Sequence, residues 1–206
     1  MSAAPVEPPT PAEPETQLDL ANRLMEQNPG SRVEIIGGVI VVSPPPDGRH
    51  ARVLTDITVP FIAAGLHGGA TAVLQGIGLW LPDGPEDYAV PDLSLVDADF
   101  DDHAIANNCY DPAIFHLVLE VTSSNYNNDL RAKVVAYANA KIPVYVIIDR
   151  KHNRVHVLTD PAENGYDSHR VHAPGEHITL PSSIGAEVKF DVEALLKAGR
   201  NGRKTD

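Results

Sequence analysis

The chain has 206 residues, 43% of them hydrophobic, and carries a formal net charge of −12 at pH 7. This length and composition predict a globular protein with a real core and exclude a disordered chain. The acidic balance argues against a protein that holds long stretches of nucleic acid on a basic surface.

The ends of the chain differ from its middle in composition. Residues 1–15 contain five prolines and almost nothing large and apolar, so we expect a flexible Pro/Glu-rich tail. We expect a single domain over residues 16–198 and a second flexible tail over 199–206. No apolar run is long enough to cross a bilayer, and no signal peptide is recognisable, which predicts a cytoplasmic protein without membrane contact.

The first folded elements are predicted to be a helix and a hairpin. Apolar residues recur at helical spacing over 18–26 and are followed by a Pro-Gly stop. Two β-branched runs, 32–36 and 39–42, flank Gly37 and Gly38. Paired glycines between such runs are typical of a tight turn, so these segments predict a β-hairpin that opens the sheet.

The next segments predict a helix followed by strands. Helical periodicity returns over 49–66, where Pro60 is expected to kink the helix or end it early. Residues 71–81 read as one strand, and residues 97–112 read as a polar loop between two later strands.

The second half of the chain alternates between the two periodicities. We expect a helix over 127–140, strands over 144–148 and 154–158, short strands and loops to residue 189, and a helix over 192–198. The whole pattern predicts an α/β (α+β) domain, in which helices flank a central mixed β-sheet that carries the N-terminal hairpin.

Two predicted strands, 90–96 and 115–121, each contain one carboxylate within an apolar run, Asp92 and Glu120. Buried carboxylates need a cation, a proton or hydrogen-bond donors. Two of them about 4 Å apart repel by roughly 4 kcal/mol, so a shared Mg²⁺ ion is one solution. The alternative is that each acid ends its strand or pairs with an arginine.

A lysine follows the second acidic strand on the predicted helix. Asp129, Lys133 and Tyr137 share one helical face. Lys133 is a candidate for positioning the attacking water or neutralising charge in a phosphoryl transition state. The alternative is a surface pair with Asp129, worth about 0.3–0.5 kcal/mol.

Two further residues are candidates for the same site. Glu34 interrupts an apolar strand as Asp92 does, although strand alternation alone would place it in solvent. His50 opens the helix after the proline turn and is a candidate for contacting phosphate or a metal-bound water. A histidine in this position is also commonly a cap or surface residue.

Other motifs are weaker. His152 and His156 have the spacing of a helical zinc pair, but their segment predicts turn and strand. The acidic run 97–102 lacks the glycine and glutamate of a calcium loop. No GxSxG, P-loop or GxGxxG motif occurs.

The ordered set of motifs resembles a large bacterial family of restriction-type endonucleases once catalogued as a domain of unknown function. The resemblance covers about residues 18–196 and rests on the following segments: Glu34-Ile35-Ile36-Gly37-Gly38-Val39-Ile40, Ser43-Pro44 with His50, Pro91-Asp92-Leu93, Leu119-Glu120-Val121 with Ser123, Asp129 with Lys133 and Tyr137, and Ile142-Pro143-Val144-Tyr145 with Ile148-Asp149.

That family belongs to the PD-(D/E)xK nuclease superfamily, so the resemblance implies a restriction-endonuclease-like fold. It implies that Asp92, Glu120 and the backbone carbonyl of Val121 hold Mg²⁺, for which Mn²⁺ can substitute. Thr122 stands where the superfamily has its lysine, and the resemblance assigns that role to Lys133. Glu34 and His50 also match positions that the family keeps at its site.

The leading hypothesis is a Mg²⁺-dependent endonuclease that hydrolyses DNA phosphodiester bonds, with weak or short contact to DNA because the chain is acidic. A second hypothesis is a catalytically inactive nuclease-like protein with a binding or regulatory role, which the displaced lysine favours. A third is a structural homo-oligomer, for which a homodimer is the simplest form.

Overall fold

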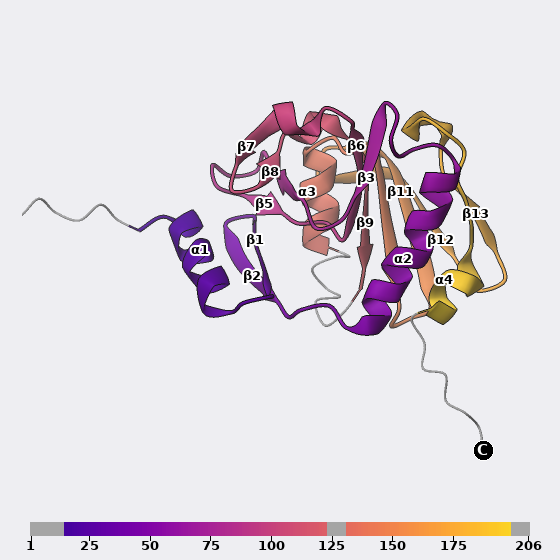
Figure 1. Cartoon of the computed structure of the whole chain (residues 1–206), viewed down its shortest axis with the longest axis horizontal. Helices are drawn as coiled ribbons and strands as arrows, with labels where there is room; N and C mark the ends of the chain where they lie inside the picture. Colours follow the sequence, from indigo (N-terminus) through magenta and orange to yellow (C-terminus); the bar gives the residue numbers. More distant parts are fainter. Residues whose placement is uncertain (1–14, 123–130, 199–206) are drawn as a thin grey trace, which may run out of the picture.

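The computed structural model describes residues 15–122 and 131–198, and Figure 1 shows their arrangement. Both predicted tails, except for Glu15, lie outside these ranges, as do Ser123, Asp129 and the start of the helix predicted over 127–140. Two six-stranded mixed sheets and one two-stranded sheet form the framework. The mixed α/β class is therefore confirmed, although the N-terminal hairpin belongs to a separate sheet and does not open the central one.

The N-terminal sheet has the strand order β2-β1-β5-β4-β8-β7. The hairpin turn has Gly37 at φ 59° and Gly38 at φ 72°, which glycine adopts without strain. A helix with a Thr16–Asp19 capping box covers β1. The elements are α1 (Gln17–Gln27), β1 (Arg32–Ile36), β2 (Val39–Ser43), β4 (Gly78–Trp80), β5 (Tyr88–Ala89), β7 (Ala104–Ala106) and β8 (Cys109–Tyr110).

The central sheet has the order β12-β11-β10-β9-β6-β3, with β9 and β10 parallel and the other neighbours antiparallel. Its strands are β3 (Thr71–Leu74), β6 (Leu93–Asp97), β9 (Phe115–Val121), β10 (Val144–Asp149), β11 (Arg154–Ala162) and β12 (Gly165–His172). The remaining elements are α2 (Gly48–Ala63), α3 (Lys133–Asn139), β13 (His177–Thr179), β14 (Lys189–Asp191), α4 (Val192–Ala198) and three short 3₁₀ turns at Phe100–His103, Pro112–Ile114 and Ser182–Ile184.

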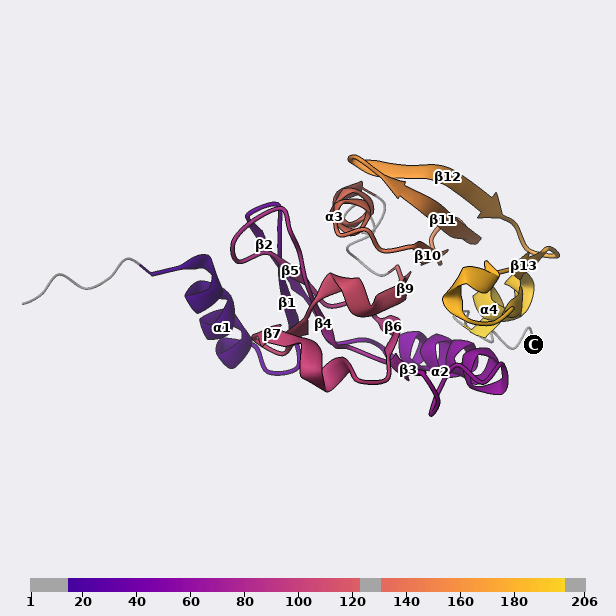
Figure 2. The same ribbon diagram turned by 90° about the horizontal axis from the view of Figure 1, so that it is seen from above.

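Helices cover both faces of the central sheet, as Figure 2 shows: α3 lies on one face, and α2 and α4 lie on the other. Strand alternation sorts the side chains of β9 between these faces. Leu117, Leu119 and Val121 pack toward α2 and α4. Val118 packs toward α3, and Glu120 follows it onto the same face by alternation. The carboxylate is therefore presented to α3.

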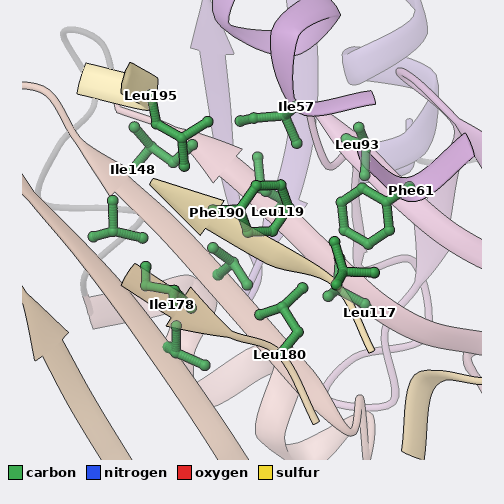
Figure 3. Close-up of a cluster of buried hydrophobic side chains, with 14 of the residues drawn as sticks. Ile57, Phe61, Leu93, Leu117, Leu119, Ile148, Ile178, Leu180, Phe190 and Leu195 are labelled. Carbon is green, nitrogen blue, oxygen red and sulfur yellow. The ribbon is translucent and has the colours of Figure 1, made fainter. Parts of the chain in front are cut away.

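The larger hydrophobic cluster lies between the sheet and α2, α4 and the β13–β14 hairpin (Figure 3). Ile57 and Phe61 of α2 are fully buried against Leu117 and Leu119 of β9. Phe190 contributes a second ring, with its centroid 5.6 Å from that of Phe61. This packing fixes α2, whose first turn reaches the candidate site.

Three segments differ from the sequence prediction. The strand predicted over 71–81 is split between β3 and β4, which belong to different sheets, and Gly76 between them has φ 66°. The loop predicted over 97–112 contains β7 and β8. Pro60 lies inside α2, which ends at Ala63 rather than at Leu66. Within the described ranges, no helix is both long and apolar enough to span a bilayer.

Replacing Phe61 by Ala is expected to lower the free energy of unfolding by about 3–5 kcal/mol, because the ring leaves a cavity in a closely packed core. Ile62→Ala on the next position of the helix is the matched control, since Ile62 is 49% exposed whereas Phe61 is 0% exposed. Its expected effect is within about 0.5 kcal/mol. Urea denaturation followed by circular dichroism measures both, and equal losses would contradict this description of the core.

Candidate active site

The two acidic residues predicted on neighbouring strands lie side by side. In the antiparallel β6–β9 pair, Leu93 is opposite Leu119. Asp92 immediately precedes Leu93, just before β6 begins, and Glu120 immediately follows Leu119 within β9. Leu119 faces the α2 side, so alternation places the Glu120 carboxylate on the α3 side. Asp92 lies before the strand, and its carboxylate contacts His50 of α2. The two carboxylates lie close together, since Arg32 approaches both; that they share one face of the sheet stays a prediction.

The first hairpin strand delivers two more charged groups to these acids. Arg32 Nη1 lies 2.7 Å from Asp92 Oδ1 and also donates to the carbonyl of Val90 at 2.8 Å. Arg32 Nη2 lies 3.9 Å from Glu120 Oε2. Glu34 Oε1 accepts a hydrogen bond from the backbone N–H of Val90 at 2.8 Å. Residues 32 and 34 reach the same side because strand alternation has a period of two.

Helix α3 supplies the lysine. Lys133 Nζ lies 2.8 Å from Glu34 Oε1 and 2.7 Å from Glu120 Oε1. One turn later, the hydroxyl of Tyr137 donates to the same Glu120 oxygen at 2.8 Å. Lys133 is only 1% exposed, so the alternative of a surface lysine does not hold. Asp129, the partner in that alternative, lies outside the described residues.

Helix α2 places His50 at the edge of the cluster. The side chain of Asp47 caps the helix by accepting from the His50 N–H at 2.7 Å. The imidazole Nε2 lies 3.2 Å from Asp92 Oδ2. That oxygen also accepts from the backbone N–H of Val121 at 2.7 Å. The cap therefore fixes the backbone of His50, and the buried imidazole ring contacts the carboxylate of Asp92.

Charge compensation dominates the electrostatics of this cluster. Burial alone would raise the pKa of Asp92, but the hydrogen bond from His50 and the charge of Arg32 hold it well below its usual range. Burial alone would lower the pKa of the Arg32 guanidinium, but the charges of Glu120, Glu34 and Asp92 raise it. With Arg32 and Lys133 charged against three carboxylates, the cluster carries about one negative charge when His50 is neutral.

Tyr137 is a hydrogen-bond donor in this environment. Burial raises the pKa of its hydroxyl well above the ordinary value, and the neighbouring Glu120 and Glu34 carboxylates raise it further. The phenol therefore remains protonated and keeps one Glu120 oxygen in place.

The structure thus brings together all five side chains predicted for the site, Asp92, Glu120, Lys133, Glu34 and His50. Sequence reasoning missed Arg32, which approaches all three carboxylates. The available signal was its position two residues before Glu34 on one strand, which puts both side chains on one face. Tyr137 was placed on the helical face of Lys133 but was given no role.

A pocket of about 690 Å³ opens beside the cluster and is lined by Arg32, His50 and Asp92. Such a volume lies in the range of about 300–1,000 Å³ found for small-molecule sites. Glu120, Glu34 and Lys133 lie behind this wall, each 1% exposed. Among the described residues, the pocket therefore reaches the cluster at Asp92 and its two basic neighbours.

The donor types suit a hard cation such as Mg²⁺, since they are carboxylate and backbone carbonyl oxygens. In the described conformation, however, Arg32 binds Asp92 where an ion would have to contact that carboxylate. Across residues 15–122 and 131–198, no three His, Cys, Asp or Glu side chains are arranged to hold an ion. Mg²⁺ binding therefore fits the chemistry of the residues but requires Arg32 to release Asp92.

The weaker motifs stay apart from this site. His152 Nδ1 and His156 Nε2 approach Asp149 at 2.9 and 3.7 Å, and His156 Nδ1 lies 2.9 Å from His169. His156 lies on a strand, as the sequence predicted, not on the helix that a zinc pair would need. The acidic run 97–102 leads from the end of β6 into a 3₁₀ turn.

Lys133→Met is expected to lower the free energy of unfolding by about 3–5 kcal/mol, because two buried carboxylates lose their cation. Lys197→Met is the control: its ammonium pairs with Glu193 but is 63% exposed, so the expected loss is at most about 0.5 kcal/mol. Adding Glu120→Gln to Lys133→Met is expected to restore part of the stability. Equal effects of the two lysine substitutions in urea denaturation would contradict a buried charge network.

The lowered pKa of Asp92 predicts a loss of stability in acid. A carboxylate with a depressed pKa in the folded state stabilises the fold above the pKa of the unfolded chain, about 3.9, and loses this contribution as the pH falls further. Asp92→Asn removes this titrating group, so its unfolding free energy is expected to fall less steeply between about pH 5 and pH 2. Denaturation at a series of pH values measures the slopes, and identical slopes would refute the assignment.

Comparison with known proteins agrees with this picture. Residues 16–193 match the Uma2 family, described as "Putative restriction endonuclease". A crystal structure of "a putative nuclease belonging to DUF820" from Anabaena variabilis superposes with a TM-score of 0.61 at 16% identity, over 82% of this chain and 91% of that chain, which shows a shared fold. No curated protein matches. Because the family match spans most of the chain, the resemblance seen in the sequence is confirmed and the protein belongs to the Uma2 family.

Proposed function

We propose that the protein is a Mg²⁺-dependent endonuclease that hydrolyses phosphodiester bonds in DNA. The observation that carries this proposal is the closeness of Asp92 and Glu120, which Arg32 approaches at 2.7 and 3.9 Å, with Lys133 bonded to Glu120. Two carboxylates and an ammonium at one point are the groups that metal-assisted phosphodiester hydrolysis requires. Membership of the Uma2 family supports the same reaction class.

Asp92, Glu120 and the backbone carbonyl of Val121 are the proposed ligands for Mg²⁺, with Mn²⁺ as a substitute. The bound ion would lower the pKa of a water molecule and offset charge on the phosphate. The N–H of Val121 already donates to Asp92 at 2.7 Å, so the carboxylate and this stretch of backbone are oriented together before any ion binds.

Lys133 and Glu34 form the proposed second part of the site. The attacking water adds to phosphorus as the bond to the leaving oxygen breaks, which gives one alcohol and one phosphate monoester. Lys133, which joins Glu34 to Glu120, would position that water and offset the negative charge that grows on the phosphate oxygens. His50, on the pocket side of Asp92, would contact the phosphate.

Arg32 would change partners during substrate binding. Its Nε is buried and has no hydrogen-bond partner among the described residues. A phosphate oxygen would satisfy this donor, and a guanidinium binds phosphate well because it presents several donors in one plane. We therefore assign Arg32 to phosphate binding once it has released Asp92.

The alternative function is a nuclease-like protein that binds without cutting. The observation that favours it is that Arg32 and Lys133 already compensate the acids, so the cluster is stable without an ion. A homodimer is a separate prediction, which light scattering at micromolar concentration measures.

Cleavage assays on plasmid and oligonucleotide DNA with Mg²⁺ or Mn²⁺ test the proposal. Asp92→Asn and Glu120→Gln are each expected to reduce cleavage at least 10³-fold, because each removes a proposed metal ligand. Asp97→Asn is the matched control: it lies at the other end of β6, paired with His116 at 2.8 Å, and is expected to cleave at the rate of the unmodified protein.

Titration calorimetry with Mn²⁺ distinguishes the two functions. Binding that Asp92→Asn abolishes, together with cleavage, supports the endonuclease. Binding without cleavage of any substrate supports the inactive alternative. No binding and no cleavage would contradict the endonuclease.

A further inference from the structure

The pocket beside the acidic cluster extends well past the groups that would perform hydrolysis. Much of its wall is apolar, with contributions from α1, β1, the segment before α2, α2 itself and the residue after β5. These apolar residues are Met25, Val33, Pro44, Pro45, Pro46, Leu54 and Val90. A phosphate and an ion need no such surface, whereas the sugar and base of a nucleotide do.

Basic and polar groups interrupt this apolar wall at separate places. Arg150 joins Arg32 and His50 among the lining residues, which gives the pocket several cationic or hydrogen-bonding groups for phosphate. On the side of β5 and the β7–β8 turn, the wall contains Tyr88, Asn107 and Asn108. Amide and phenol groups are suited to hydrogen bonding with the edge of a base.

The hydroxyl of Tyr88 is buried and donates to no acceptor among the described residues. Tyr88 itself is 2% exposed. Burial raises the pKa of Tyr88 to about 12, and hydrogen bonding by the Asn107 side chain acts in the opposite direction, so any interaction with Asn107 is one that the phenol oxygen accepts and not one that its O–H donates. The phenol is therefore a protonated donor, and a buried donor without a partner costs about 1–3 kcal/mol. A ligand in the pocket would supply that partner.

The depth of the acids limits which DNA can reach them. Asp92 is 6% exposed, and Glu120 and Lys133 are 1% exposed, so the phosphodiester must enter the pocket. In an intact duplex the bases are stacked and paired inside the double helix, so no single nucleotide is free to enter a pocket. Proteins that take a nucleotide into a pocket therefore act on single strands or extrude the nucleotide first.

The net negative charge of the chain also argues against binding of an intact duplex. A net charge of −12 leaves little basic surface to hold a duplex, whose binding depends on many phosphate contacts. A pocket that binds one nucleotide through a few charged groups and an apolar wall needs far fewer such contacts.

We infer that the pocket lined by Arg32, Tyr88 and Arg150 binds an unpaired nucleotide, so that the substrate is single-stranded DNA or a strand opened at a bubble. Only the cleavage measurement in the test below rests on the proposed function. The binding measurement is independent of hydrolysis.

The test compares three labelled 20-nucleotide probes of one sequence: a single strand, a duplex, and a duplex with a central unpaired bubble. Cleavage is measured with Mg²⁺ or Mn²⁺, and binding is measured by fluorescence anisotropy with Ca²⁺. We expect the single strand and the bubble to be bound and cut at least tenfold better than the duplex. If the bubble probe were bound and cut as weakly as the duplex while the single strand was preferred, the substrate would be restricted to free single strands.

Three variants of the full chain locate the effect in the pocket. Ser31→Trp places a large side chain on the lining and is expected to weaken binding of the single strand at least tenfold. Val39→Trp, at a position 61% exposed on β2 and outside the lining, is the matched control with no expected effect. Tyr88→Phe is expected to weaken binding about three- to tenfold without lowering thermal stability, because the O–H that it removes donates to no acceptor among the described residues.

The outcomes separate this inference from the proposed function. Duplex cleaved as fast as the single strand overturns the inference and leaves the endonuclease intact. Selective single-strand binding that Ser31→Trp abolishes, without cleavage of any probe, supports the inference and contradicts the endonuclease. Equal weakening by Ser31→Trp and Val39→Trp overturns the inference, whatever is cleaved.

Discussion

The buried ammonium of Lys133 between Glu34 and Glu120 is the interaction on which the arrangement of this protein depends. It joins α3 to β9 in the central sheet and to β1 in the N-terminal sheet, at 2.7 and 2.8 Å. Burying a charge costs free energy unless it has a partner of opposite charge. Displacing any one of these three elements would therefore leave a buried charge without its partner. Arg32 strengthens this connection by joining Asp92 from the same strand as Glu34. The network therefore sets the position of the hairpin relative to the central sheet.

The same charge balance connects stability with the proposed chemistry. The acids that would hold Mg²⁺ are already compensated by Arg32 and Lys133. Under the proposed function, Mg²⁺ binding would be an exchange, in which the ion would take the place of Arg32 at Asp92 and the guanidinium would become available to a phosphate. Functional sites commonly carry buried charge whose arrangement favours activity over maximal stability.

Much of the fold was readable from local patterns, and part of the site was readable from residue types. The hairpin followed from Gly37 and Gly38, and the closeness of Asp92 and Glu120 followed from two interrupted apolar strands. The division of residues 71–81 between two sheets was not readable, because both halves carry the same strand pattern and only tertiary pairing separates them. Arg32 was missed because an arginine at the start of a strand is ordinary in sequence. Its role arises only when β1 is brought against the central sheet.

The central claim is that Asp92 and Glu120 share one divalent ion at the position that Arg32 occupies on Asp92. Crystals soaked in Mn²⁺ and measured at the manganese absorption edge test it directly. The account predicts one anomalous peak in contact with both carboxylates, with the guanidinium of Arg32 withdrawn from Asp92. No peak at these residues, or an ion elsewhere while Arg32 remains on Asp92, would contradict it.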